Sequence, residues 1–134
     1  MTPEKLIALA IKAMDNAYAP YSGFTVGAAL LCSDGTVYTG CNIENAAYSP
    51  TNCAERTAIF KAVSEGRRDF TAIAVCGGKN GQITKLCPPC GVCRQVLQEF
   101  CKEDFPIYLA AKDGFQSLTL GQLLPYSFGD DALK

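Results

Sequence analysis

Two predicted helices of this chain begin at cysteines, and this feature constrains the fold most. Cys53-Ala54-Glu55 opens one helix, and Pro89-Cys90-Gly91-Val92-Cys93 opens another. The amide groups at a helix N-terminus carry partial positive charge and favour thiolate over thiol, and thiolate is the form that binds zinc. Two cysteines three residues apart can reach one ion at zinc–sulfur distances of about 2.3 Å. We therefore expect both helix starts to meet at one metal ion.

Three protein ligands leave the fourth tetrahedral position to water, which is the arrangement of a catalytic zinc site. Glu55 lies two residues after Cys53 and can point at this water without binding the metal. A carboxylate there can accept a proton from the water and later deliver it to a leaving group. We predict that Glu55 is the catalytic residue and that one zinc ion per chain is bound by Cys53, Cys90 and Cys93.

Composition narrows the class of protein. The 134 residues include eight cysteines and no histidine, which excludes Ser-His and Cys-His dyads and imidazole ligands. In a reducing compartment such cysteines are more often buried, metal-bound or catalytic than paired in disulfides. The net charge of -1 suggests no nucleic-acid polymer or membrane as partner, and no apolar run reaches the length of a membrane span. The N-terminus does not resemble a signal peptide, so we expect a cytoplasmic protein.

The predicted elements indicate one α/β domain over residues 1–134. Apolar periodicity predicts helices at 3–18, 53–65 and 91–102, with a short one near 120–124, and strands at 24–31, 36–41, 70–76 and 107–111. Asp34-Gly35 between the first two strands predicts a hairpin. Strands that alternate with helices after a hairpin imply a mixed sheet covered by helices.

The same cysteines allow two alternative kinds of metal site. Cys87 or Cys101 could complete a closed four-cysteine structural zinc site, but that site would leave Glu55 without a role. An iron–sulfur cluster of the bacterial ferredoxin type needs a fourth cysteine followed by proline, where this chain has Leu97 and Gln98.

Cys87 also competes with Cys90, because it lies three residues before it. Two prolines follow Cys87 and hold it in extended chain, so we favour Cys90 as the ligand. The remaining cysteines are predicted to be small buried apolar side chains: Cys32, Cys41, Cys76 and Cys101.

The Cys-x-Glu and Pro-Cys-x-x-Cys motifs together match the signature of zinc deaminases, in its three-cysteine version. With Asn42-Ile43-Glu44-Asn45-Ala46 they make the chain resemble cytidine deaminases of the small, homotetrameric, three-cysteine type. The resemblance runs from Tyr18-Ala19-Pro20-Tyr21-Ser22 to Leu123-Leu124-Pro125. It implies a three-layer α/β/α fold with a mixed central sheet. It also implies hydrolytic deamination of cytidine and 2′-deoxycytidine to uridine and 2′-deoxyuridine, in pyrimidine salvage.

The resemblance further implies substrate contacts. Asn42 and Glu44 match ribose contacts, although a self-bonded polar turn is the alternative for this loop. Phe24 matches an aromatic residue that packs against the base, and a plain core role is equally open for it. Backbone near Ala54 and Cys90 would hold the pyrimidine edge. Contacts that complete a neighbouring protomer's site in the tetramer would come from Ala46, Tyr48 and Phe128.

The positive charge of Arg56 lies next in sequence to Glu55 and close to the ligand Cys53, where the net charge of the metal site matters. Three thiolates and one zinc ion sum to -1, so the metal should acidify water less than it does with neutral ligands. We hypothesise that Arg56 donates hydrogen bonds to ligand thiolates and restores part of this electrophilicity. The alternative is an ordinary arginine on the helix surface.

Other functions share the zinc motifs. A deaminase of the blasticidin type would carry both motifs, but the Asn-Ile-Glu-Asn loop favours a free ribonucleoside. A polynucleotide editor would need a basic patch, and the short chain shows none. A zinc-stapled binding module without turnover is the alternative from outside the enzymes.

Overall fold

A mixed five-stranded sheet runs through the protein, in a computed structural model that describes residues 1–134. The strands are β1 (Phe24–Cys32), β2 (Val37–Cys41), β3 (Phe70–Lys79), β4 (Pro106–Ala111) and β5 (Gly114–Thr119). The helices are α1 (Pro3–Ala13), α2 (Ala54–Ser64), α3 (Gly91–Phe100) and α4 (Leu120–Leu123). The strand order is β2-β1-β3-β4-β5, in which only β3 and β4 pair in parallel. No helix is both long and apolar enough to span a bilayer.

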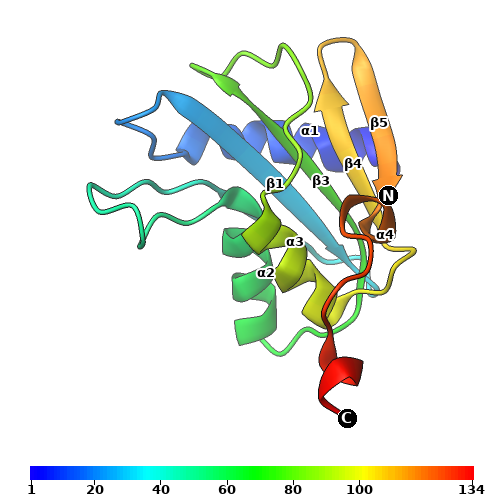
Figure 1. Ribbon diagram of the computed structural model, residues 1–134. Coiled ribbons are helices and arrows are strands. Elements are labelled where there is room, and N and C mark those ends of the chain that lie inside the picture. Colours follow the sequence, from blue (N-terminus) through cyan, green and yellow to red (C-terminus); the bar gives the residue numbers. More distant parts are fainter.

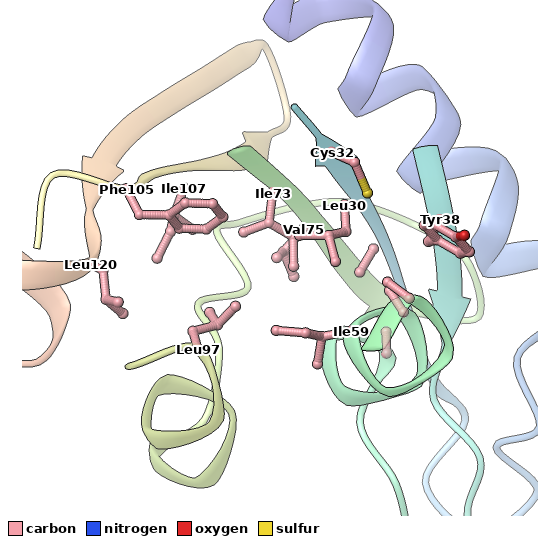
Figure 2. Packing of buried hydrophobic residues seen from close by; sticks show 14 of the residues in the cluster. Leu30, Cys32, Tyr38, Ile59, Ile73, Val75, Leu97, Phe105, Ile107 and Leu120 are labelled. Atoms are coloured by element: carbon pink, nitrogen blue, oxygen red, sulfur yellow. The ribbon is translucent and has the colours of Figure 1, made fainter. Parts of the chain in front are cut away.

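Helices cover both faces of the sheet, with α1 on one face and α2 and α3 on the other (Figure 1). Because successive strand residues point to opposite faces, each face has its own core. Figure 2 shows the larger core, which includes Leu30, Ile59, Val75 and Leu97. The core beneath α1 includes Leu6, Ala10, Ala29 and Ala74. The predicted α/β architecture in three layers is thus confirmed.

Three elements differ from the prediction. Strand β5 was not predicted, because this edge strand is mostly exposed and lacks an apolar alternation. Strand β3 continues through two glycines to Lys79, three residues beyond the predicted end at residue 76. Helix α1 ends at Ala13 rather than at residue 18. A 3-10 turn, Met14–Asn16, follows it, and Tyr18 pairs with Ile43 beyond β2.

The start of α2 lies directly on the end of β2. A Cβ atom on Gly40 would come within 2.4 Å of the Ala54 carbonyl oxygen, so only glycine permits this approach. The Thr57 hydroxyl lies 3.0 Å from the Cys41 carbonyl oxygen and 3.1 Å from that of Cys53. These contacts fix the first turn of α2, and with it Cys53, relative to the sheet.

Replacing Gly40 by alanine is expected to lower the free energy of unfolding by about 2 kcal/mol, because the methyl group forces α2 away from β2. Chemical denaturation measures this change. Gly91→Ala is the matched control, since a Cβ atom at Gly91 meets nothing within 4 Å. Equal stabilities for the two variants would contradict the close-packing argument.

Candidate active site

Three thiols converge where α2 and α3 begin. Cys53 and Cys90 are the N-cap residues of the two helices, and Cys93 lies in the first turn of α3. The Cys53 and Cys90 sulfur atoms are 3.6 Å apart, those of Cys90 and Cys93 are 3.5 Å apart, and all three lie within 4.8 Å of one another. Tetrahedral zinc with bonds of about 2.3 Å places its sulfur ligands about 3.8 Å apart. The donor atoms and their spacing therefore fit zinc, and Cys87 is outside the group.

The electrostatics of the site favour an ionised thiol. A hydrogen bond from the Cys93 thiol, assisted by the Arg56 guanidinium, lowers the pKa of Cys53 to about 5. The same hydrogen bond and burial raise the pKa of Cys93, which keeps the proton of the pair. Arg56 Nη2 donates to Cys53 Sγ at 3.3 Å. The hydrogen bond expected between Arg56 and a thiol of the cluster is thus present.

Glu55 lies beside the thiols in the first turn of α2. Its side chain is only 4% exposed, and burial raises the pKa of its carboxyl group to about 7. One carboxyl oxygen, Oε1, is buried without a hydrogen-bond partner. A buried polar atom in that state is costly unless something else binds it, so Oε1 is suited to a ligand or water in the site. A carboxyl group with a pKa near 7 can both accept and donate a proton at neutral pH.

A cavity of about 220 Å³ joins these groups to the loop after β2. The thiols of Cys53 and Cys90 and the carboxyl group of Glu55 meet there with polar side chains of the loop that precedes Cys53. The lining consists of Val26, Asn42, Glu44, Thr51, Asn52, Cys53, Ala54, Glu55, Cys87, Pro88 and Cys90. Half of the residues that the sequence analysis selected therefore line one cavity: Asn42, Glu44, Cys53, Ala54, Glu55 and Cys90.

The amide of Asn42 is engaged with the backbone of β1. Asn42 Oδ1 accepts from the Val26 N–H at 2.9 Å, and Nδ2 donates to the Phe24 carbonyl oxygen at 2.9 Å. These two contacts tie the Asn42 side chain to β1 rather than to its own turn. A second Nδ2 hydrogen and a second Oδ1 lone pair remain free for another partner.

Phe24 lies beside the cavity rather than in its lining. A Cβ atom at Gly77 would be 3.1 Å from the Phe24 ring and 2.8 Å from Cys87 Sγ, so this glycine lets both side chains approach. Phe24 is 36% exposed, which argues against a plain core role.

The residues assigned to neighbouring sites lie outside this cavity. Ala46 and Tyr48 belong to an exposed loop that projects from the body of the protein, and Tyr48 lines an adjoining cavity of about 180 Å³ (Figure 1). Phe128 is exposed, and its carbonyl oxygen accepts from Gln95 Nε2 at 2.8 Å. None of the three residues lines the cavity that contains the thiols of Cys53 and Cys90.

The other cysteines are all free thiols. Cys32 and Cys76 are buried, as predicted, whereas Cys41 and Cys101 are half-buried. Cys87 lines the cavity, where burial raises the pKa of its thiol to about 11.

Comparison with known proteins places these features in a family. Residues 1–109 match the family model described as the cytidine and deoxycytidylate deaminase zinc-binding region. The chain is 54% identical to the cytidine deaminase of Sporosarcina psychrophila, over 100% of this chain and 96% of the relative. The chain belongs to the cytidine deaminase family. A solved cytidine deaminase from Burkholderia pseudomallei matches with a TM-score of 0.88 and 46% identity, covering 96% of this chain and 100% of that one. The cytidine deaminase of Mycobacterium tuberculosis matches with a TM-score of 0.81 and 40% identity, covering 96% and 98%.

As a cytidine deaminase family member, the protein has a zinc-binding deaminase region and a cluster of three thiols that could hold the metal. Sequence reasoning had not selected Thr51, Asn52 or Ser22. Their signal was weak, because polar residues in a loop are ordinary.

Proposed function

We propose that this protein catalyses zinc-dependent hydrolytic deamination of cytidine and 2′-deoxycytidine, in pyrimidine salvage. Water and the nucleoside give uridine or 2′-deoxyuridine and ammonia. One observation carries the proposal: three thiols at zinc spacing share a cavity with a buried carboxyl group whose Oε1 has no partner.

In the proposed mechanism Cys53, Cys90 and Cys93 hold one zinc ion per chain. When bound, zinc supplies Lewis acidity that lowers the pKa of a water molecule. Glu55 accepts a proton from the attacking water and gives it to ring N3, which makes C4 more electrophilic. The water oxygen bonds to C4, and Glu55 then takes the remaining proton of that oxygen and passes it to the amino group. The C4–N bond breaks, ammonia leaves, and C4 becomes a carbonyl carbon. Backbone groups of Ala54 and Cys90 hold the pyrimidine edge.

The sugar side of the cavity suits an uncharged nucleoside. We propose that Asn42 and Glu44 bind ribose hydroxyls, since an amide and a carboxylate together supply donors and acceptors for a diol. Phe24 packs against the base. Glu44 lines both the cavity that contains the thiols and the adjoining cavity with Tyr48, and neither lining includes a lysine or an arginine. A 5′-phosphate would meet the Glu44 carboxylate without a compensating cation, which favours nucleosides over nucleotides.

We further propose that residues 1–134 form a single catalytic domain that assembles as a homotetramer in the cytoplasm. Neighbouring protomers would complete each site through Ala46, Tyr48 and Phe128. The large exposed side chains of Tyr48 (91%) and Phe128 (61%) support such contacts, since exposed aromatic residues often mark interfaces.

The experiment is a zinc assay paired with ultraviolet absorbance of cytidine, deoxycytidine and their 5′-monophosphates mixed with pure protein. The expected result is about one zinc ion per chain and conversion of the two nucleosides, with much slower conversion of the monophosphates. Bound zinc with no spectral change for either nucleoside would leave a binding module as the better interpretation.

Arg56→Ala is expected to lower both turnover and zinc retention about tenfold, because the Cys53 thiolate loses its hydrogen-bond donor. Initial rates and zinc release to a chromogenic chelator measure the two effects. Arg68→Ala is the control, since Arg68 bonds only backbone carbonyls at the far end of α2. Wild-type rate and zinc retention in Arg56→Ala would make Arg56 an ordinary surface arginine.

A further inference from the structure

The hydroxyl group of Ser22 connects two residues of the proposed nucleoside site. Ser22 lies in the turn before β1 and does not line the cavity that holds the thiols. Its Oγ donates to Glu44 Oε2 at 2.5 Å and accepts from the Phe24 N–H at 2.9 Å. A hydroxyl group has one hydrogen to donate and lone pairs to accept, so it satisfies both contacts at once.

The same turn holds the other oxygen of the Glu44 carboxylate. Glu44 Oε1 accepts from the Tyr21 N–H at 3.0 Å and from the Ser22 N–H at 3.2 Å. Both carboxylate oxygens are thus held by one short segment, which leaves the carboxylate little freedom to rotate. Hydrogen bonds to an ionised acceptor are about twice as strong as those between neutral groups, so these contacts stabilise one orientation of the Glu44 carboxylate.

The turn that contains Ser22 and Gly23 is itself hydrogen-bonded to the end of β3. Lys79 Nζ donates to the Ser22 carbonyl oxygen at 2.7 Å, and the Asn80 N–H donates to the Gly23 carbonyl oxygen at 2.7 Å. Gly23 has a φ of +70°, a conformation that favours glycine. The position of the Glu44 carboxylate is therefore set by the sheet, although Glu44 itself lies on a loop.

We propose that Ser22 is a positioning residue for the nucleoside sugar: its hydroxyl group orients the Glu44 carboxylate toward a ribose hydroxyl and fixes the Phe24 backbone beside the base. The inference rests on the proposed function. A carboxylate that is already oriented loses less freedom when it binds the sugar, so Ser22 acts on substrate binding. Ser22 touches neither the thiols nor Glu55, and therefore leaves the proton transfers unchanged.

Ser22→Ala is expected to raise the KM for cytidine about tenfold while kcat stays within about twofold, since the lost contact serves binding alone. Ser22→Thr keeps the hydroxyl group and should restore most of the affinity. Ser33→Ala, an exposed serine at the β1–β2 turn, is the matched control and should behave as the wild type. Thermal unfolding of each variant separates loss of affinity from loss of fold.

A double-mutant cycle with Glu44→Gln tests the route of the effect. If Ser22 acts through Glu44, the changes in kcat/KM should be non-additive, because Ser22→Ala has little left to remove once the carboxylate is gone. Additive effects, an unchanged KM in Ser22→Ala, or equal losses in the alanine and threonine variants would overturn the inference. A wild-type protein that does not deaminate cytidine would instead overturn the proposed function itself.

Discussion

Glu55→Gln is expected to keep zinc and to lose turnover by a factor of about 1,000 or more. Glutamine has nearly the same size as glutamate but cannot accept and return a proton, and general acid–base catalysis by one group contributes about 10²–10⁴-fold. The buried Oε1 without a partner and the carboxyl pKa near 7 are the features that suit Glu55 to this exchange. Initial rates with cytidine and the zinc content of the purified variant measure the two outcomes.

The control for this experiment is Glu99→Gln, a charge-neutralising change at an exposed position of α3 away from the cavity. It should leave both rate and zinc content unchanged. Glu55 is 4% exposed, and removal of its charge should, if anything, stabilise the fold, because burial disfavours the ionised form. A loss of turnover in Glu55→Gln could therefore not be attributed to unfolding, and substantial activity in this variant would reject the shuttle role.

The thiol cluster was predictable because its signal lies in residue type and local position. Helix N-termini favour the thiolate form of cysteine, and the i, i+3 spacing of Cys90 and Cys93 places both in one turn. Cys53 was predicted to join Cys90 and Cys93 because a catalytic zinc site has three protein ligands. The helix and strand pattern was predictable where one face of an element is buried, as in α3 with Leu97 and β1 with Leu30.

The contacts around Glu44 were not predictable, because they join segments through hydrogen bonds rather than through apolar periodicity. Ser22 and Glu44 are 22 residues apart, and nothing in either local sequence specifies their pairing. Strand β5 was missed for a related reason. Its order comes from the ladder with β4 and from contacts such as Phe115 with Tyr108, whereas its own residues are mostly polar and exposed.

The choice between Cys90 and Cys87 rests on a local sequence signal and on contacts between distant segments. Prolines after Cys87 predicted extended chain, and the structure has no helix there. The Cys87 sulfur lies close to Gly77 and outside the thiol cluster, against the wall of the same cavity. Because Cys87 and Cys90 line the same cavity, substitution of each cysteine in turn tests which of them binds the metal.

Cys90→Ala is expected to reduce bound zinc from about one ion per chain to a small fraction of that, because two thiolates do not make a closed or catalytic zinc site. Cys87→Ala, the matched substitution three residues earlier, should keep the full zinc content. Atomic emission of gel-filtered protein measures both, and circular dichroism checks that each variant is folded. Zinc loss in Cys87→Ala with retention in Cys90→Ala would reverse the assignment. Loss in both would instead indicate a four-cysteine site, in which no position remains for water and Glu55 has nothing to deprotonate.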